Sequence, residues 1–373
     1  MIMMNIKKNF ITIIGCGYVG LVTGTCLSSL GKKVICIDKN KKIIDSLNSG
    51  KLTIYEKNLK QIFNKNLNKK LFFSNNFKDS LKYSDISIIA VGTPLKKRKI
   101  NYDYISSATI DLAKCIKLKN KHHLIIIKST ILPTTCEKII IPLIEKYSDK
   151  KLNKDFSIVV NPEFLREGQA VEDFLNPDRI VIGYSNKRSK IKTRKIYSSF
   201  DENLFHYSNL KTAELIKCAS NSLFGTLISF SNEISNLSNK VGGIDTNQLF
   251  KGIIRDRRIS TNIKSGKIKS AGIASYIYPG PGFGGSCLPK DILSLSNYGR
   301  LIKNKMPILE SVIKTNDNQY LRILKYLNTK KIKNRKIITI LGLSFKPNTD
   351  DLRDSPSINL IKKLIKLDYN IKV

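Results

Sequence analysis

A cysteine in a glycine-rich loop has the clearest chemical potential in this sequence. The loop reads GFGGSCLPKD over 282–291, with Cys287 two residues before Pro289. Proline suits the first turn of a helix, so Cys287 should stand at a helix N-terminus. The helix dipole and the nearby Lys290 would favour the thiolate, and the glycines would let a bulky substrate approach it. Such a thiolate can add to an aldehyde, and loss of a hydride to a nicotinamide then leaves a thioester that water hydrolyses. A small buried cysteine in a glycine turn explains these residues equally well.

A glycine motif near the N-terminus has the spacing of a dinucleotide-binding turn. Gly15, Gly17 and Gly20 follow an apolar run at 10–15, and helical spacing begins directly after them. The first glycine permits a tight turn, the second lets the backbone approach a pyrophosphate, and the third lets helix and strand pack closely. Asp38, at the end of the next apolar run, would accept hydrogen bonds from both ribose hydroxyls and repel a 2′-phosphate. We therefore expect NAD, with its phosphates at a helix N-terminus.

Short apolar runs alternate with helical spacing over roughly the first half of the chain. Runs of this length, ended by glycine, proline or polar residues, are typical of buried parallel strands. Their alternation with helices predicts a doubly wound α/β sheet. The strands are expected at 10–15, 33–38, 85–91, 123–130, 157–164 and 179–184, with helices at 19–30 and 41–49.

The pattern becomes helical after the last of these strands. Apolar residues recur at helical spacing, without proline, over 210–240, which predicts one long helix. More helical segments follow, interrupted by the loop that carries Cys287. A strand from Lys336, a helix over 357–367 and a final strand make one further unit, which is too small for an independent sheet. The expected domains, the last of them incomplete, are 1–205, 206–328 and 329–373.

The charge and the cysteine content argue against several classes of protein. The net charge is +36, but the lysines are scattered through almost every segment and do not gather with aromatic residues, so nucleic-acid binding is disfavoured. A positive field should still attract anionic substrates such as nucleotides. The seven cysteines show neither CxxC pairs nor metal-ligand spacing with histidines, so we expect no disulfide framework and no metal.

The N-terminal segment resembles a secretory signal only superficially. Two lysines precede an apolar stretch, but no small-residue cleavage site follows, and the stretch continues into the glycine motif. We interpret it as the first strand. The longest aliphatic runs, such as Leu124–Ile127, are far shorter than the roughly 20 residues that span a bilayer. A cytoplasmic protein without membrane association is expected.

Several motifs, in one consistent order along the chain, resemble those of a known family. They are GCGYVG (15–20), VGTP (91–94), KST (128–130), NPEFLREG (161–168), AELIKCASN (213–221), SFSNE (229–233), GFGGSCLPKD (282–291) and GLSFKPNTDDLRDSPS (342–357). The family is that of the UDP-glucose/GDP-mannose dehydrogenases, and the resemblance covers almost the whole chain. Its members oxidise the C6 alcohol of a nucleotide-bound sugar to a carboxylate in two steps, with two NAD and no metal. This favours the catalytic interpretation of Cys287.

The resemblance implies a role for each matching polar residue. Cys287 looks like the nucleophile that forms a thiohemiacetal and then a thioester. Lys217 and Asn221 resemble the pair that stabilises the oxyanion, and their i, i+4 spacing places both on one helix face. Asp291 resembles the residue that positions the hydrolytic water. The residues that resemble the groups assisting proton transfer through water are Thr130, Glu163 and Glu167.

The resemblance also implies which residues bind cofactor and substrate. The cofactor residues would be Gly15, Gly17, Tyr18, Val19, Gly20, Asp38, Thr93, Thr130 and Glu167. The substrate residues would be Glu163, Phe164, Leu165, Lys217, Asn221, Arg258, Phe283, Gly284, Phe345 and Lys346, with Arg258 reaching the substrate of the partner subunit. The implied α/β architecture is a Rossmann-like NAD-binding domain, a central domain that forms a homodimer through its long helix, and a second, incomplete Rossmann-like domain that binds the nucleotide.

Other interpretations stay open from the sequence alone. Lys217 and the two glutamates could be solvated charges, Asn221 could be a satisfied core amide, and Glu214 could be merely the helix partner of Lys217. UDP-glucose is the expected substrate, because the Lys-Asp ending of the cysteine loop resembles the glucose and mannose enzymes. GDP-mannose and UDP-N-acetylhexosamines are the alternatives. A truncated, non-catalytic NAD-binding protein and a basic nucleic-acid binder are the remaining classes.

Overall fold

The computed structural model of the 373-residue chain describes residues 10–262, 268–330 and 337–373. The N-terminal lysines and Lys336, on which two of the expectations fall, lie outside these ranges. The chain divides into two compact units, residues 1–217 and residues 218–373.

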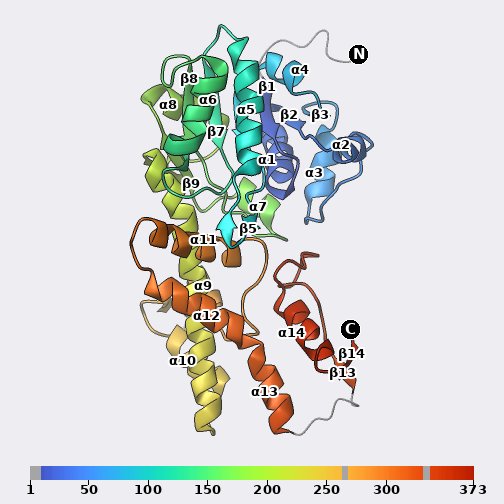
Figure 1. The fold of residues 1–373 in the computed structure, drawn as a ribbon, viewed down its shortest axis with the longest axis vertical. Coiled ribbons are helices and arrows are strands. Elements are labelled where there is room, and N and C mark those ends of the chain that lie inside the picture. Colours follow the sequence, from blue (N-terminus) through green and yellow to red (C-terminus); the bar gives the residue numbers. More distant parts are fainter. Residues whose placement is uncertain (1–9, 263–267, 331–336) are drawn as a thin grey trace. The chain divides into compact units, whose positions relative to one another are not determined.

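A sheet of eight strands forms the centre of the N-terminal unit (Figure 1). Its order is β10-β9-β8-β7-β4-β1-β2-β3. The strands from β8 to β3 in this order run parallel, β9 is antiparallel to β8, and β10 pairs in parallel with β9. The strands are β1 (Phe10–Ile14), β2 (Lys33–Ile37), β3 (Leu71–Ser74), β4 (Ser84–Ile89), β7 (His123–Ile127), β8 (Phe156–Val160), β9 (Ile180–Tyr184) and β10 (Phe205–Ser208).

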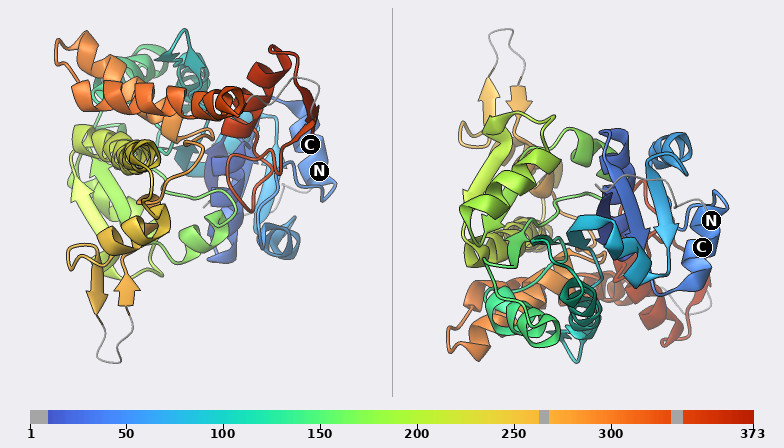
Figure 2. Two further views of the ribbon diagram at one scale, coloured as in Figure 1. Left: turned by 90° about the horizontal axis from the view of Figure 1, so that it is seen from below. Right: turned by 90° about the horizontal axis from the view of Figure 1, so that it is seen from above.

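Helices cover both faces of this sheet and enclose two hydrophobic cores (Figure 2). Alternate residues of one strand enter opposite cores, so that Ile13 belongs to the first core and Ile14 to the second. Burial on both faces explains why the strands read as unbroken apolar runs. The first face carries α1 (Tyr18–Ser29), α2 (Lys41–Asn48), α3 (Leu59–Asn66), α7 (Ala170–Leu175) and α8 (Lys187–Ile196), and the second carries α4 (Phe77–Lys82), α5 (Asp103–Lys117), a π-helical turn at Cys136–Ile140 and α6 (Ile141–Ser148).

The sheet is doubly wound, as its alternating strands and helices predict. The strand order reverses between β1 and β4, which pair with each other. Open α/β sheets bind ligands beyond the carboxyl ends of the strands at such a switch point. The glycine motif follows β1, and Thr93 lies in the loop after β4. The fold therefore brings the expected dinucleotide-binding residues to the switch point.

Two features of this sheet differ from expectation. The sequence does not predict the edge strands β3 and β10, because both are short and partly exposed. It also does not predict the reversed direction of β9, since a strand buried on both faces has the same apolar pattern in either direction, and β10 takes its direction from β9, with which it pairs in parallel. A small hairpin of β5 (Leu95–Lys96) and β6 (Lys99–Ile100) lies outside the sheet.

A helix of 32 residues, α9 (Leu210–Val241), leads from the N-terminal unit into the second unit. It confirms the long helix that the apolar spacing predicts over 210–240. No helix of the described ranges, α9 included, is both long enough and apolar enough to cross a membrane. The other elements of the second unit are α10 (Thr246–Ile254), β11 (Ser260–Asn262), β12 (Ile268–Ser270), a 3-10 turn (Gly272–Tyr276), α11 (Leu288–Leu301), α12 (Pro307–Gln319), α13 (Leu321–Thr329), β13 (Ile337–Thr339), α14 (Pro356–Ile365) and β14 (Asn370–Lys372).

The last described segment is the strand–helix–strand unit that the sequence predicts. β13 and β14 pair in parallel, and α14 connects them. Leu327, Leu360, Leu364 and Tyr369 form a small core between α13, α14 and the end of the chain. Parallel pairing across a connecting helix is the βαβ arrangement of a Rossmann-like sheet.

Candidate active site

The three motif glycines form the turn between β1 and α1, and each has its own geometric reason. Gly15 has φ +104°, and a Cβ there would lie 2.9 Å from the carbonyl oxygen of Ala90. A Cβ on Gly20 would lie 1.9 Å from the carbonyl oxygen of Gly15, so only glycine allows the helix to pack here. Apart from Gly17 itself and its neighbours along the chain, no described atom lies within 4 Å of the Cβ position of Gly17. The turn therefore fits a dinucleotide, whose phosphates the open backbone at the start of α1 would hold.

Asp38 follows β2 and holds this turn in place. Its carboxylate accepts hydrogen bonds from the backbone N–H of Cys16, at 2.8 Å, and of Asn40, at 2.9 Å. A carboxylate has roughly four lone-pair positions, so capacity remains for ribose hydroxyls. The neighbouring Lys39 is directed toward α5, where its Nζ lies 2.6 Å from the carboxylate of Asp111. Asp38 thus has a structural role that the sequence did not reveal.

Replacing Asp38 with alanine should weaken NAD binding about ten- to a hundredfold, the loss expected for one or two hydrogen bonds to a charged group. Calorimetric titration with NADH measures the dissociation constant. Asp45→Ala is the matched control, because Asp45 is an exposed aspartate on the adjacent helix α2. Equal affinities in wild type and the Asp38 variant would remove this residue from the cofactor site.

Polar contacts join the loops that follow β4 and β7. Thr93 is buried, and its hydroxyl donates to the carbonyl oxygen of Thr130 at 2.8 Å. The Ser129 hydroxyl donates to the carbonyl oxygen of Val91 at 2.6 Å. Since β4 and β7 are neighbours in the sheet, these bonds bring two predicted site residues together at its carboxyl edge.

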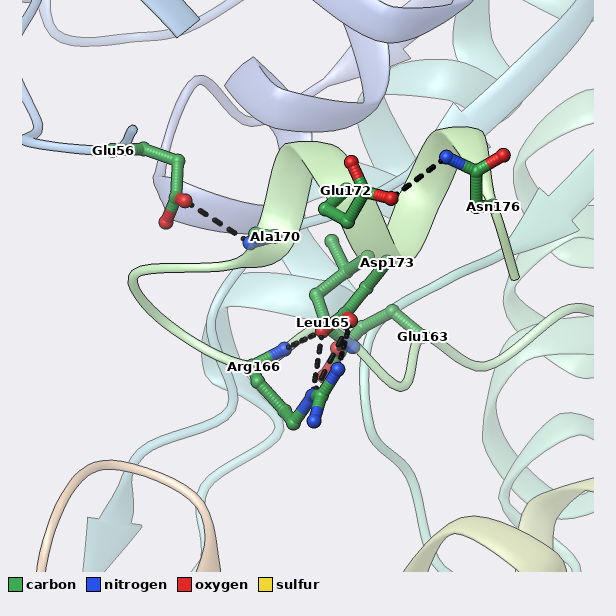
Figure 3. A network of polar contacts seen from close by, with 8 residues as sticks. All are labelled: Glu56, Glu163, Leu165, Arg166, Ala170, Glu172, Asp173 and Asn176. Carbon is green, nitrogen blue, oxygen red and sulfur yellow. Dashed lines mark hydrogen bonds and ion pairs between the residues drawn. The ribbon is translucent and has the colours of Figure 1, made fainter. Parts of the chain in front are cut away.

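Glu163 and Lys217 form a buried ion pair within the N-terminal unit. Lys217 Nζ lies 3.0 Å from Glu163 Oε1, and each side chain is 5% exposed. The other carboxylate oxygen accepts from the backbone N–H of Leu165 at 2.7 Å. Figure 3 shows Glu163 in the loop that leads from β8 to α7. Neither residue is the solvated surface charge that the sequence left open.

The surroundings of Glu163 favour its ionised form. Burial alone would raise the pKa of this carboxyl, but the ammonium of Lys217, the N–H of Leu165 and the ammonium of Lys128 outweigh burial and hold the pKa below its usual value. Glu163 is therefore a carboxylate at neutral pH. Removing one member of such a buried pair leaves the other as an uncompensated charge.

The sequence left open Lys217 as the partner of Glu214, but the structure shows Glu214 bonded to backbone N–H groups. Its carboxylate accepts from the backbone N–H of Thr134, at 2.7 Å, and of Cys136, at 2.9 Å. Burial raises the pKa of Glu214. Glu214 thus ties the segment after β7 to α9, while the ion pair of Lys217 is made with Glu163.

Cys287 stands at the N-terminus of α11, as the proline spacing predicts. It is the N-cap residue, and the helix begins at Leu288 with Pro289 in its first turn. Its thiol is half-buried, in contrast to most of the other cysteines, and Sγ lies 3.5 Å from the hydroxyl oxygen of Ser286. The thiol therefore combines partial exposure with a helix N-terminus.

Three polar side chains lie around the first turn of α11. Asp291 is fully buried, pairs with Lys290, and accepts a hydrogen bond from the side-chain amide of Asn221 at 2.6 Å. Its N–H donates to the carbonyl oxygen of Cys287 at 2.9 Å, one helical turn away. Burial lowers the pKa of Lys290, but the Asp291 carboxylate and then the Cys287 thiolate raise it overall. The attraction is mutual, so Lys290 favours the thiolate of Cys287.

The glycines before the cysteine accommodate another part of the same chain. A Cβ on Gly284 would lie 2.3 Å from the carbonyl oxygen of Asp354, and a Cβ on Gly285 would lie 2.8 Å from the ring of Phe345. Gly285 has φ +82°, and its N–H donates to the carbonyl oxygen of Arg353 at 2.9 Å. The side of each glycine on which a side chain would stand therefore faces the motif at 342–357, and the approach of substrate to these glycines stays a prediction.

Side-chain amides brace the rest of the glycine-rich loop. Asn316 on α12 accepts from the N–H of Phe283 at 2.7 Å and donates to its carbonyl oxygen at 3.0 Å. Asn232 on α9 accepts from the N–H of Gly280 at 2.7 Å, and Gln319 donates to the Gly280 carbonyl oxygen at 2.9 Å. These amides were not predicted as site residues, because contacts between a loop and distant helices leave no local pattern.

Two predicted substrate residues of the second unit lie in exposed or partly exposed segments. The side chain of Arg258 is 89% exposed, and its guanidinium pairs with Asp256 at 2.7 Å. The ammonium of Lys346 lies 5.6 Å from the centroid of the Phe345 ring.

The remaining predicted residues surround the first turn of α1 and the loop after β8. Tyr18, Val19, Phe164 and Leu165 are partly buried against the two cores of the N-terminal unit. Glu167 is half-buried. Burial raises the pKa of Tyr18, and the carboxylate of Glu167 contributes to this rise, so the two side chains are electrostatic neighbours.

Family comparison assigns the chain in three consecutive segments. Residues 9–201 match the NAD binding domain of the UDP-glucose/GDP-mannose dehydrogenase family, residues 211–318 match its central domain, and residues 339–373 match its UDP binding domain. The chain belongs to the UDP-glucose/GDP-mannose dehydrogenase family. It is an NAD-dependent enzyme of the nucleotide-sugar dehydrogenase class, so the family predicted from the motifs is confirmed.

Relatives within the UDP-glucose/GDP-mannose dehydrogenase family align along nearly the whole chain. A UDP-glucose 6-dehydrogenase from Rickettsia bellii is 42% identical over 372 residues, which cover 97% of this chain and 80% of the relative. A GDP-mannose 6-dehydrogenase from Pseudomonas putida is 33% identical over 365 residues, with the same coverage of 97% and 80%. The structure of a UDP-glucose dehydrogenase from Pyrobaculum islandicum superimposes with a TM-score of 0.89 at 31% identity, covering 99% of this chain and 82% of that one. The predicted fold class is confirmed.

The KST motif of the dehydrogenase family contains a residue that the sequence analysis did not single out. Lys128 is buried, its Nζ donates to Oδ1 of Asn161 at 3.2 Å, and it lies 6.0 Å from the centroid of the Phe174 ring. Burial lowers the pKa of Lys128 to about 8; the attraction of Glu163 opposes this change and the repulsion of Lys217 adds to it. A lysine directly after a buried strand was the signal available in the sequence.

Because Lys128 is buried, its contribution to the stability of the folded chain should depend on pH. Its pKa is about 8 in the folded chain and near the ordinary value of 10.5 in the unfolded chain. Between these values the unfolded chain binds the extra proton, so the contribution of Lys128 to stability rises with pH. The unfolding free energy of wild type relative to Lys128→Met should increase by up to about 3 kcal/mol from pH 7 to pH 10.5. Urea denaturation at each pH measures it, and a pH-independent difference would contradict the lowered pKa.

Proposed function

We propose that the chain oxidises UDP-glucose to UDP-glucuronate with two molecules of NAD, through a thioester on Cys287. The observation that carries this proposal is the half-buried thiol of Cys287 at the N-terminus of α11, one helical turn before Asp291 and electrostatically coupled to Lys290. Helix N-termini and ammonium groups both favour a thiolate, which is the nucleophilic form. No other described cysteine has this combination.

The first oxidation requires a cofactor site and a path for one proton. The turn at 15–20, Asp38 and Thr93 would hold NAD, which supplies the hydride acceptor for both oxidations. As the C6 alcohol becomes an aldehyde, it loses a hydride and a proton. Water held by Thr130, Glu163 and Glu167 takes up the proton in this proposal.

The second oxidation takes place on the enzyme-bound sugar. Sγ of Cys287 bonds to C6 of the aldehyde, and Lys217 and Asn221 donate hydrogen bonds to the oxygen that becomes negative. Loss of the second hydride converts this thiohemiacetal into a thioester. Water oriented by Asp291 then adds to C6, the C–S bond breaks, and the carboxylate and the free thiol are released.

UDP-glucose is favoured over the other nucleotide sugars by the degree of similarity. Relatives named UDP-glucose 6-dehydrogenase from Rickettsia species are 40% to 42% identical, whereas those named GDP-mannose 6-dehydrogenase from Pseudomonas species are 33% to 34% identical. Phe283 and Gly284 would approach the sugar, and Phe345 and Lys346 would contact the nucleotide. GDP-mannose and UDP-N-acetylhexosamines are the competing substrates.

The proposal includes a homodimer formed through α9. Leu223, Phe230, Leu237 and Val241 are each at least half exposed. Their spacing of seven, seven and four residues aligns them on one face of the helix, as in a helix–helix seam. A continuous apolar row of this kind is typical of an interaction surface. Arg258 would reach the substrate of the partner subunit from such a dimer.

The proposal also includes domain boundaries near 205/206 and 328/329. The family matches, which end at 201 and 318 and resume at 211 and 339, support these positions. The start of α9 at Leu210 supports the first boundary.

A cytoplasmic location is part of the same proposal. All seven cysteines are free thiols. Free thiols persist in reducing compartments, and a half-buried catalytic thiol that substrate must reach requires one.

An assay with NAD and a panel of UDP- and GDP-sugars tests the proposed function. We expect two NADH for each UDP-glucose consumed, and UDP-glucuronate as the product. One NADH for each sugar would mean that oxidation stops at the aldehyde and would exclude the thioester route. Preferred turnover of GDP-mannose or a UDP-N-acetylhexosamine would replace the proposed substrate. NADH from none of the sugars would contradict the function itself.

A further inference from the structure

Glu56 is a buried carboxylate that joins two separate parts of the N-terminal unit. It lies between α2 and α3 and is 5% exposed. Its Oε2 accepts hydrogen bonds from the hydroxyl of Tyr18 and from the N–H of Gly168, the latter at 2.8 Å. Its Oε1 accepts from the N–H of Ala170 at 3.0 Å (Figure 3). These two peptide groups lie 112 and 114 residues further along the chain, so only the tertiary fold brings them to Glu56.

Both ends of this bridge belong to the proposed site. Tyr18 is the first residue of α1 and lies inside the glycine turn. The N–H of Gly168 belongs to the peptide bond that follows Glu167, and its φ of +83° is a conformation that favours glycine. Because one oxygen of Glu56 accepts from both Tyr18 and Gly168, a displacement of the tyrosine ring alters the bond that holds the peptide after Glu167.

The three hydrogen-bond donors that surround Glu56 suit a residue that holds other groups in position. Enclosing a carboxylate costs free energy, which hydrogen bonds recover only in part. Holding the two peptide N–H groups at the start of α7 would not require the additional bond to Tyr18. Burial first, and the carboxylate of Glu56 second, raise the pKa of Tyr18. The hydroxyl therefore stays protonated and remains a donor across the physiological pH range.

We propose that Glu56 is a positioning residue that transmits occupancy of the dinucleotide site, through Tyr18, to the loop at 163–170 that carries Glu163 and Glu167. Binding of a dinucleotide against the glycine turn restricts Tyr18, and Tyr18 in turn fixes the shared oxygen of Glu56. The peptide after Glu167 is then held in one position. The coupling itself does not depend on the proposed function. Only the expected decrease in kcat rests on that function.

Hydrogen exchange of the backbone amides tests the coupling without any turnover. In the wild-type chain, saturating NADH should slow exchange of the Gly168 and Ala170 amides about ten- to a hundredfold, the range expected when a hydrogen bond to a charged group is secured. In Tyr18→Phe, measured at an NADH concentration that saturates that variant, the slowing should be lost. Glu172→Gln is the matched control, because this exposed carboxylate on α7 bonds only to Asn176 among the contacts seen in Figure 3, and it should behave as wild type.

Kinetics supply the second arm of the test. Glu56→Gln places an amide donor against a backbone N–H. Tyr18→Phe removes the hydrogen bond from the tyrosine hydroxyl to Glu56 but leaves the hydrogen bonds from the N–H groups of Gly168 and Ala170 in place. Each variant should lower kcat about tenfold or more, and the double variant should be no worse than the poorer single variant, because both changes interrupt one connection. Additive losses in kcat, with Tm unchanged, would mean that the two residues act independently.

The outcomes separate this inference from the proposed function. If NADH slows exchange at Gly168 and Ala170 equally in wild type and in Tyr18→Phe, or does not slow it in wild type, the coupling is refuted whatever the chain oxidises. If the exchange pattern is as expected but no nucleotide sugar is turned over, the coupling stands and the proposed function falls. Should Glu56→Gln fail to fold, the Tyr18→Phe measurements still decide the question.

Discussion

Replacing Cys287 with serine should reduce the formation of UDP-glucuronate at least about a thousandfold, because a serine hydroxyl is not ionised at neutral pH and is a far weaker nucleophile than a thiolate. The change is nearly isosteric, so folding should be preserved at the N-terminus of α11. Product chromatography together with the NADH yield measures the effect. In wild type, acid quenching during turnover of the sugar aldehyde with NAD should also trap the thioester as a covalent mass increment on the peptide that contains Cys287.

The control for this substitution is Cys115→Ser. Cys115, on α5, is the other half-buried cysteine of the chain and has no predicted role in catalysis. Burial raises the pKa of Cys115, which makes it a poor nucleophile. The control should retain wild-type activity. Undiminished acid formation by the Cys287 variant, or an adduct on Cys115 instead, would eliminate the thioester route proposed here.

Replacing Lys217 with methionine should lower both stability and activity. The Glu163 carboxylate would lose its buried partner, which should cost about 3 kcal/mol of unfolding free energy at neutral pH. Glu163 has a lowered pKa in the folded chain, so the stability that the pair supplies is present above the ordinary carboxyl pKa and is lost as the pH falls through the folded value. Urea denaturation from pH 7 downward measures the unfolding free energy of each protein. The difference in unfolding free energy between wild type and variant should become smaller below about pH 4. Activity should fall at least about a hundredfold, because the oxyanion loses a charged donor.

A double substitution distinguishes the structural role of Lys217 from its catalytic role. Combining Lys217→Met with Glu163→Gln removes both buried charges and should restore most of the lost stability, since neither charge is then unpaired. Activity should remain low. Lys211→Met is the control on the same helix, because Lys211 forms an exposed pair with Glu137 and should change stability by about 0.5 kcal/mol or less. Recovery of full activity in the double variant would show that Lys217 serves only to neutralise Glu163.

Local chemistry accounts for the features that could be predicted from the sequence. The glycine turn is specified within a few residues: Gly15 requires a positive φ, and Gly20 avoids a clash with the carbonyl oxygen of Gly15. The position of Cys287 at a helix N-terminus follows from Pro289 in the first turn. The long helix α9 follows from apolar spacing, which is a property of one segment.

Contacts between distant segments account for the features that could not be predicted. The partner of Lys217 is Glu163, 54 positions earlier in the numbering, and not Glu214 on its own helix. The glycine at 284 packs against the backbone of Asp354 and does not face open space. In each case the residue types were visible, but several partners of suitable charge or size were available to them.

The sequence by itself determined the type of sheet, the dinucleotide turn and the position of Cys287 at the start of its helix, because backbone conformation and apolar periodicity are set by neighbouring residues. Only the tertiary structure decided the direction of β9, the burial of Lys128 and the bridge from Tyr18 through Glu56 to Gly168. Burial and partner choice depend on which segments meet in space, and the free energy of a buried charge depends on all the groups around it.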